Sequence, residues 1–337
     1  MEILIRLSAF VSAFSCMAVW EYWIPCRPLL RPRRERWVTN LSLTTFNSLL
    51  VWGTVGSLAY ATALFAAQQG MGLLHWIPRP SWAAVVVTLL GLDFAIYLHH
   101  VLFHAVPILW RLHQVHHADI DIDATTGLRF HPLEIFLSFG LKTAVVLILG
   151  AVPWVVIAFE ILLNASSIFN HSNVAIPGRV DAWLRWCLVT PDMHRIHHST
   201  RTVETNSNFG FSFSWWDRVC GTYRAHPLLG HRQMLIGLSD YRSPLTLGQL
   251  LLLPFRGSAG RSAFIQRWRR HAGKMSPQQL QLLLSQGQPP LVLDVRNPDE
   301  FVGEWGHITG AVLCPLPALA TKMNDLAAHH THAVVIV

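Results

Sequence analysis

Long apolar segments fill most of the first half of this chain and restrict what it can fold into. A helix of about 20 apolar residues spans a bilayer. The apolar segment 133–169 is long enough for two such helices with a break at Gly150 and Pro153. The chain is 52% hydrophobic and 13% charged, whereas globular domains carry about 25% charged residues. We therefore expect a mainly α-helical, polytopic membrane bundle. Its spans would cover residues 3–24, 44–67 and 81–103, with a helical hairpin within 133–169.

A cluster of arginines between the first two spans predicts the orientation. Basic loops stay on the cytoplasmic side of a membrane, so this loop is expected to be cytoplasmic. Two spans separate this loop from residues 104–131, and two more separate those residues from 171–198. Both segments are therefore expected on the same side as the loop. The basic residues do not form one patch of the kind that binds nucleic acid, so no nucleic-acid partner is expected. The arginines of the loop are Arg27, Arg31, Arg33, Arg34 and Arg36.

Glycine and tryptophan residues carry two smaller expectations. Gly53, Gly56 and two alanines near the centre of the second span would permit close packing against another helix. Trp215 and Trp216 would anchor the chain at the bilayer surface, where tryptophan is enriched.

Three histidine clusters lie beside the apolar segments and predict a metal site. Residues three and four apart share one face of a helix, so each cluster aims its imidazoles at a common point. Neutral imidazole is a ligand for iron, copper, nickel and zinc. Eight such ligands exceed the needs of one tetrahedral zinc but suit two metal ions. The clusters are His100 and His104; His113, His116 and His117; and His194, His197 and His198.

Other polar residues near the clusters are candidates for supporting roles. His171 follows the hairpin and is a plausible ninth ligand, while His131 could be a ligand or a donor behind one. Ligating imidazoles give their second N–H to a carboxylate or carbonyl. An ionised carboxylate within a span is costly, which marks Asp93 as functional. The candidate carboxylates are Asp93, Asp119, Asp121, Asp123, Glu134 and Asp192.

The character of the chain changes after about residue 242. A basic stretch over 243–275 could lie on anionic lipid as a linker. From Ser276 a helix start and a leucine stripe indicate a soluble α/β module. Leu291–Leu293 and Ala333–Val337 are expected to be its buried strands. The predicted domains are therefore 1–242, 243–275 and 276–337.

The histidine motifs resemble the fatty acid hydroxylase (sterol desaturase) superfamily. The matching runs are Asp93-x3-Tyr97-x2-His100-x3-His104, Leu109-Trp110-Arg111-x-His113-x2-His116-His117, Thr126-x2-Arg129-x-His131-Pro132-x-Glu134, His171-Ser172-Asn173, His194-x2-His197-His198, Asn208-x-Gly210 and Trp216-Asp217-Arg218-x2-Gly221-Thr222-Tyr223.

This resemblance implies a non-haem di-iron oxygenase that uses O2 to hydroxylate or desaturate a lipid. It implies nine ligands, with Asp93, His131, Glu134 and Asp192 behind them. One departure is Ser167, which lies one turn before His171 where some members have a further histidine, so water or His131 would complete the set. Since no flavin, haem or nucleotide motif is present, the resemblance also implies an external electron donor of the ferredoxin or cytochrome b5 type. The ligands would be His100, His104, His113, His116, His117, His171, His194, His197 and His198.

The C-terminal module resembles the first half of a rhodanese-like domain. The similarity lies in Leu293-Asp294-Val295-Arg296-x-Pro298-x-Glu300-Phe301 and in Gly306-His307-Ile308-x-Gly310-Ala311. The catalytic cysteine loop of that family would follow residues 333–337, and Cys314 precedes them. We therefore expect only a partial rhodanese-like module without a complete sulfurtransferase site.

Two other functions fit parts of the pattern. A zinc-dependent lipid hydrolase would use histidines in the membrane, although such sites need three protein ligands and a water. A non-enzymatic membrane scaffold could present the rhodanese-like module as a binding domain. Iron content with O2-dependent turnover, set against zinc content without it, separates the first of these from an oxygenase.

Overall fold

The computed structural model describes residues 2–256, except 55, 77, 79 and 80. It also describes 281, 284, 285, 291–294, 298–302, 306–315 and 334–336. The chain divides into two compact units, Met1–Trp268 and Arg269–Val337. Each unit is described by itself.

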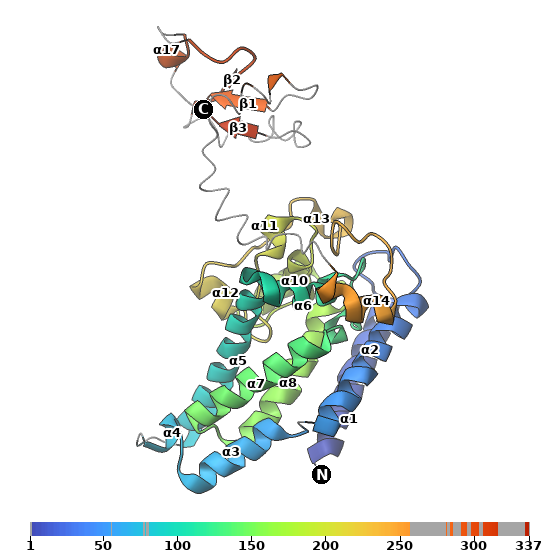
Figure 1. Cartoon of the computed structure of the whole chain (residues 1–337), viewed down its shortest axis with the longest axis vertical. Coiled ribbons are helices and arrows are strands. Elements are labelled where there is room, and N and C mark those ends of the chain that lie inside the picture. Colours follow the sequence, from blue (N-terminus) through green and yellow to red (C-terminus); the bar gives the residue numbers. More distant parts are fainter. Residues whose placement is uncertain are drawn as a thin grey trace. The chain divides into compact units, whose positions relative to one another are not determined.

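The first unit is a bundle of long apolar helices (Figure 1). Among the described residues, five segments are long and apolar enough to cross a membrane: Glu2–Trp23, Arg33–Trp76, Ser81–Ala105, Pro132–Leu149 and Pro153–His171. The predicted bundle of long apolar helices is thus confirmed. Its helices are α1 (Glu2–Trp23), α2 (Arg33–Thr54), α3 (Leu58–Gln69), α4 (Leu73–Trp76), α5 (Ser81–Ala105), α7 (Pro132–Leu149) and α8 (Pro153–His171).

The second predicted span is not one helix. Helix α2 ends at Thr54 and α3 begins at Leu58. Gly56 lies between them with a φ of 43°, a left-handed conformation that glycine adopts without steric cost. The predicted close packing at Gly53 and Gly56 is wrong, because a Cβ at either position would meet nothing within 4 Å. Gly56 therefore allows the chain to turn between α2 and α3 and does not serve as a contact between packed helices.

The predicted hairpin within 133–169 is confirmed as α7 and α8. Gly150 ends α7 in the left-handed conformation, and Pro153 begins α8 at a position where a proline needs no hydrogen-bond donor. A Cβ at Gly150 would lie 2.4 Å from the carbonyl oxygen of Met71. Only glycine therefore allows this turn to lie so close to the segment before α4.

Short helices form a cap at the end of the bundle where α5 finishes (Figure 1). All three histidine clusters lie at this end of the bundle, so their predicted convergence is confirmed. That this end lies at a membrane face stays a prediction. The elements of the cap are α6 (Pro107–His117), η1 (Thr126–Leu128), α9 (Gly178–Leu184), α10 (Pro191–His197), α11 (Thr202–Thr205), α12 (Trp215–Val219), α13 (Gly230–Gln233), α14 (Leu247–Leu252) and η2 (Leu253–Phe255).

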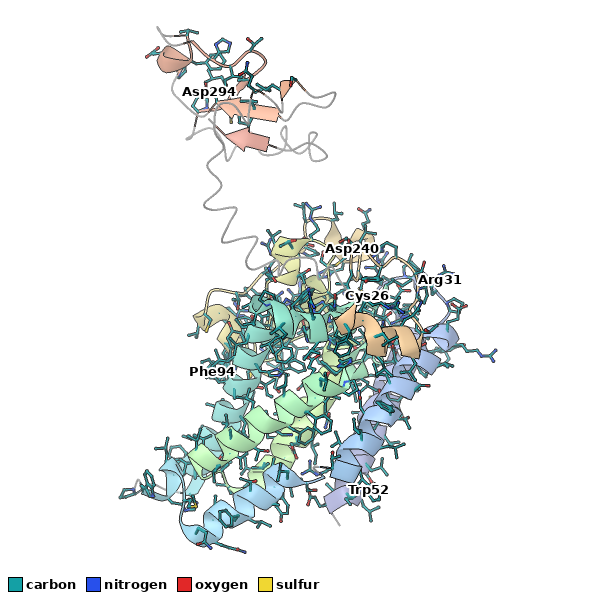
Figure 2. All side chains as sticks on the ribbon, viewed as in Figure 1. Cys26, Arg31, Trp52, Phe94, Asp240 and Asp294 are labelled. Atoms are coloured by element: carbon teal, nitrogen blue, oxygen red, sulfur yellow. The ribbon has the colours of Figure 1, made fainter. Side chains whose placement is uncertain are left out.

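The arginine-rich loop between α1 and α2 is part of this cap. Figure 2 places Cys26 and Arg31 at the cap end and Trp52 at the opposite end of the bundle. Arg36 is 2% exposed and donates from Nε and Nη2 to the two carboxylate oxygens of Asp119, at 2.8 and 2.7 Å. Arg27 donates to the Met234 carbonyl oxygen at 2.9 Å. These two arginines therefore hold the cap together as well as contributing to the charge of the loop.

The predicted linker over 243–275 overlaps packed structure. Leu250 of α14 and Leu253 of η2 are buried with Leu43 and Val115 in one hydrophobic cluster. Residues 247–255 are therefore attached to α2 and α6. The basic residues of the linker from Arg261 onward lie outside the described residues, and the three-domain division stays a prediction.

The second unit contains a small parallel sheet in the order β2-β1-β3. The elements are β1 (Leu291–Asp294), α17 (Pro298–Phe301), β2 (Val312–Leu313) and β3 (Val334–Ile336). The two predicted strands therefore form. The leucine-striped helix predicted from Ser276 lies largely outside the described residues, and the rhodanese-like assignment stays a prediction.

Candidate metal centre

The nine predicted ligand histidines lie together in the cap in two groups. Within each group the potential ligand atoms lie within 4.8 Å of one another, and every one of these residues is buried. The five-histidine group consists of His100, His104, His113, His117 and His197. The four-histidine group consists of His116, His171, His194 and His198.

Helical spacing explains how four separate elements supply these side chains. His100 and His104 share one face near the end of α5, and His113 and His117 lie one turn apart on α6 in the same way. His116, next to His117, belongs to the other group. His171 is the last residue of α8. His194 and His197 lie on α10, and His198 is the residue that caps its C-terminal end.

Most of the rings are oriented by a hydrogen bond on the side away from the centre. His100 donates from Nδ1 to the Phe209 carbonyl oxygen at 2.8 Å, and His197 donates to that of Ser207 at 2.9 Å. His171 donates to the carbonyl oxygen of Ser167 at 2.6 Å. The remaining contacts of this kind join His104 to Asn206 Oδ1, His113 to Glu134 Oε1 and His116 to the Arg129 carbonyl oxygen.

These outer contacts fix the tautomer. A neutral imidazole that donates from Nδ1 keeps its lone pair on Nε2, and these Nε2 atoms point inward. The inner distances are 3.1 Å from His100 Nε2 to His113 Nε2 and 3.0 Å from His116 Nε2 to His171 Nε2. Lone pairs that face each other this closely repel unless a cation lies between them. The arrangement therefore fits metal ions.

Burial keeps these imidazoles unprotonated. The pKa values of His113, His116 and His117 lie well below the ordinary histidine value, chiefly because burial penalises the charged form. The same cause lowers the pKa values of His194, His197 and His198. Metal ligation requires neutral imidazole, so the groups are already in the right protonation state.

Unpartnered nitrogen atoms give a second indication of a bound cation. Neither ring nitrogen of His198 has a hydrogen-bond partner among the described residues, and the same holds for Nε2 of His197. Buried polar atoms without partners are rare in proteins because they lose their hydration without compensation. A metal ion would give such nitrogens a partner.

Glu134 is the predicted supporting carboxylate that contacts a ligand candidate. Its Oε1 accepts from His113 Nδ1 at 2.6 Å, and both side chains are buried. Asp93 instead accepts from Trp216 Nε1 at 2.8 Å and from the Phe213 amide at 3.3 Å. In the described part of the chain these bonds tie the segment 213–216 to α5, and the predicted role of Asp93 behind a ligand histidine stays a prediction. Trp216 is half-buried through this bond and Trp215 is exposed, and the predicted anchoring of both at the bilayer surface stays a prediction.

Two other predicted supporting residues have structural partners. His131 is the N-cap of α7, where its Nδ1 accepts from the Leu133 amide at 3.2 Å. Asp192 pairs with Arg195 on the same helix. Among the described residues neither His131 nor Asp192 has a recorded bond to the nine histidines. A role of His131 or Asp192 behind the ligands has no such contact to support it and stays a prediction.

The residues that sequence reasoning missed are mainly backbone groups. The segment 206–209 contributes the acceptors for His100, His104 and His197. Asp217 holds this segment by accepting from the amides of Phe209 and Gly210 at 2.7 and 2.8 Å, and burial raises its pKa to about 6. The motif Asn208-x-Gly210 marks the segment, but a motif does not reveal which carbonyl groups face inward.

A cavity of about 380 Å³ adjoins the five-histidine group and extends between the long helices. His100, His113 and Glu134 line one part of it. Its wall also includes Phe10 of α1, Val51 of α2 and Leu163 of α8. A largely apolar space between membrane helices suits a lipid chain better than a polar solute.

Comparison with known proteins agrees with this geometry. Residues 85–222 match the Fatty acid hydroxylase family. The matched region covers less than half of the chain and contains all nine clustered histidines.

Individual proteins that are similar to this chain have the names of lipid-modifying enzymes. Alkylglycerol monooxygenase of Xenopus tropicalis is 32% identical over 137 residues, which cover 41% of this chain and 30% of the relative. Ornithine lipid hydroxylase OlsE of Rhizobium tropici is 24% identical over 224 residues, 65% of this chain and 66% of the relative. Cholesterol 25-hydroxylase of Mus musculus is 29% identical over 173 residues, which cover 46% of this chain and 56% of the relative. The chain thus spans between about a third and two thirds of these relatives, and no solved structure matches.

Proposed function

We propose that this chain is a membrane lipid oxygenase. It would use O2 and external electrons to hydroxylate or desaturate a fatty acyl or sterol-like lipid, with two iron ions held by the nine clustered histidines. One observation carries the proposal: neutral imidazoles in two groups present Nε2 lone pairs to one another beside a cavity between membrane helices. The named relatives support a lipid as the substrate.

The protein's own residues have three tasks in this reaction. The nine imidazoles would hold the metals, and Glu134 with the backbone of 206–209 would keep the rings in position. Apolar walls would exclude water and place a C–H bond near the five-histidine group, which is the group that borders the cavity. When bound, non-haem iron supplies the redox chemistry that combines O2, two electrons and two protons with the substrate.

A partner must supply those electrons. The described residues form helices and a small sheet, and the sequence has no flavin or haem motif, so a ferredoxin or cytochrome b5 type donor remains our proposal. The relatives name an alkylglycerol, an ornithine lipid and cholesterol. These substrates differ in the polar group, so the relatives restrict the class of substrate to lipids without selecting one.

The two alternative functions fit the geometry less well. A zinc hydrolase needs three protein ligands and an open position, whereas nine imidazoles converge here in two groups. A scaffold without enzymatic activity has no use for buried imidazoles that are held neutral and lack partners. The hydrolase requires zinc in place of iron, and the scaffold requires that lipids stay unchanged.

The test is direct. The full chain, purified in lipid nanodiscs, is expected to contain iron. With a reductant, an electron donor and O2 it should add one oxygen atom to a lipid or remove two hydrogen atoms, as measured by mass spectrometry. Zinc in place of iron, or unchanged lipids with iron fully loaded, would contradict the proposal. His75→Ala serves as a control, since His75 lies on α4 at the other end of the bundle.

Orientation and domain organisation are further parts of the proposal. The cap and the C-terminal unit would be cytoplasmic, and the rhodanese-like module would occupy residues 276–337 after a linker at 243–275. Cysteines engineered at Arg34, Thr200 and Trp76 test the orientation with a membrane-impermeant label. We expect positions 34 and 200 to react from the cytoplasmic side and position 76 from the other side. Labelling of 34 and 200 from opposite sides would exclude the orientation.

A further inference from the structure

Three charged side chains meet deep among the long helices. Glu160 of α8 pairs with Lys142 of α7 and with Arg6 of α1. Lys142 and Glu160 are largely buried, with 8% and 9% of their side-chain surface exposed, and the Arg6 side chain is 25% exposed. Charged residues within a membrane are costly and occur where they line a pathway or bind a ligand. This ion cluster therefore requires a function.

The ion cluster lines the same cavity as the metal centre. Arg6, Lys142 and Glu160 border it together with His100 and His113. Lys142 follows Glu134 by eight residues on α7, which corresponds to about 12 Å along a helix axis. Glu160 precedes His171 by eleven residues on α8, or about 16 Å. The cavity thus has a metal-binding part and, about 12 to 16 Å away, a charged part.

The charges favour a particular kind of ligand group. Two cations on this part of the cavity wall face one carboxylate, that of Glu160, while Arg6 also pairs with Glu2, which does not line the cavity. On the wall itself the donors of Arg6 and Lys142 therefore outnumber the carboxylate acceptors. Lysine and arginine side chains only donate hydrogen bonds. An oxygen group that accepts hydrogen bonds would therefore be bound more favourably in this part of the cavity than a hydrocarbon.

We infer that the ion cluster of Arg6, Lys142 and Glu160 binds the oxygen-bearing polar group of a single-chain lipid whose hydrocarbon chain extends toward the five-histidine group. The identity of this lipid as a substrate rests on the proposed oxygenase function, but its binding does not. The separation of 12 to 16 Å sets the position of oxidation at about ten carbon–carbon bonds or slightly more from the polar group. The ion cluster is then a positioning and specificity site.

Binding can be measured without turnover. The probes are palmitate, hexadecanol and hexadecane, which share a sixteen-carbon chain and differ in the oxygen group. Affinity for the full chain in nanodiscs would be read from the shift in unfolding temperature with each probe. We expect the oxygen-bearing probes to bind about tenfold or more tightly than hexadecane, because hydrogen bonds to charged groups contribute that much. A preference for palmitate over hexadecanol would identify the group as anionic, and equal affinity would identify it as a neutral oxygen.

The variant must remove all three charges together. Changing Lys142 alone would leave Glu160 with fewer partners in a buried site, which destabilises proteins. The triple variant Arg6→Met, Lys142→Met, Glu160→Met replaces the cluster with side chains of similar length. It should fold, because Glu2, which loses its partner Arg6, is partly exposed and still accepts from Ser57 Oγ at 3.1 Å. In this variant the three probes should bind equally. The matched control is Asp181→Asn with Arg185→Met, a buried ion pair on α9 that does not line the cavity.

Two outcomes would overturn the inference. One is equal binding of all three probes to the wild-type protein, as expected if the cluster only joins helices or holds water. The other is an unchanged preference for oxygen-bearing probes in the triple variant. If wild-type protein binds the probes as expected but oxidises no lipid, the proposed function fails while this binding site stands. If lipids are oxidised at one position in both proteins, the site fails while the function stands.

Discussion

The two histidine groups differ in how firmly their rings are held. In the five-histidine group, four rings donate from Nδ1 to an acceptor: His100, His104, His113 and His197. In the four-histidine group, His116 and His171 do so, while His198 has no partner at either nitrogen among the described residues. One group is therefore positioned by the fold, and the other depends more on the metal that it would bind.

The same comparison explains the position of Ser167. Ser167 is the residue at which the chain departs from the superfamily pattern. It lies one turn before His171, which belongs to the smaller, four-histidine group. Ser167 does not act as a ligand candidate here: its hydroxyl donates to the Gly127 carbonyl oxygen at 2.8 Å, and its own carbonyl accepts from His171. The smaller group therefore offers one imidazole fewer than the larger group, and a further ligand for a metal held there would have to come from another group.

The largest expected effect comes from removing a ligand of the weaker group. His198→Ala leaves three imidazoles in the four-histidine group, of which only His116 and His171 are held by an outer hydrogen bond. We therefore expect loss of about half of the bound iron and nearly all turnover, because metal affinity depends on such outer contacts. His197→Ala leaves four imidazoles in the other group and should retain more iron. Iron per chain is measured by plasma mass spectrometry, with His75→Ala as the control. Equal iron loss in all three variants would indicate misfolding.

A smaller effect is expected from weakening the outer support of the stronger group. Glu134→Gln keeps an acceptor for His113 Nδ1 but removes the charge. Loss of such partners typically costs about 10- to 100-fold in metal affinity or activity, and we expect the lower end of this range. Competition with an iron chelator measures the affinity. An unchanged affinity would show that His113 is held by packing alone.

The metal-free protein should lose stability as the pH falls. Burial lowers the pKa values of His116 and His198, among others, below the ordinary value of 6.5. The unfolded chain then binds more protons than the folded one below about pH 6.5, so stability is complete above that pH and declines as the pH falls through it. Unfolding temperatures of chelated protein between pH 7.5 and 5.5 measure this. Metal-loaded protein should show a weaker decline, and a stability that rises on acidification would contradict the prediction.

The smallest effect is expected for Asp93→Asn. Asparagine still offers an oxygen to Trp216 Nε1, so the segment 213–216 should stay attached to α5. Because Asp93 does not contact the two groups, iron content should be unchanged and turnover should fall by no more than about twofold. Turnover and iron are measured side by side. A loss of iron would mean that the segment 206–209 moves when Asp93 is changed.

The sequence predicted the helices and the histidines for clear physical reasons. Apolar segments of bilayer length and imidazoles at helical spacing are local patterns, and both α7–α8 and the nine clustered histidines were found from them. The partners of Asp93, His131 and Asp192 were not predictable in this way. Each carboxylate or imidazole has several possible partners nearby, and the choice depends on how the segments 206–216 and 190–195 pack.

The division between α2 and α3 was missed for a similar reason. Glycine in an apolar segment is compatible with close packing and with the end of a helix. Composition does not separate these alternatives, whereas the positive φ of Gly56 does. Likewise, the pairing of Arg6 with Glu160 joins residues far apart in the sequence, so the continuity of the cavity with the ion cluster required the structure.

The dispersal of the histidines over α5, α6, α8 and α10 also determines when the centre can be assembled during biosynthesis. His171 and His194 belong to the same group as His116, so that group remains incomplete until α8 has entered the membrane and α10 has been synthesised. Metal loading therefore has to follow insertion of the whole bundle. In iron-starved cells the helices would be inserted normally, and the unfinished cap would be the part of the protein first exposed to proteolytic quality control.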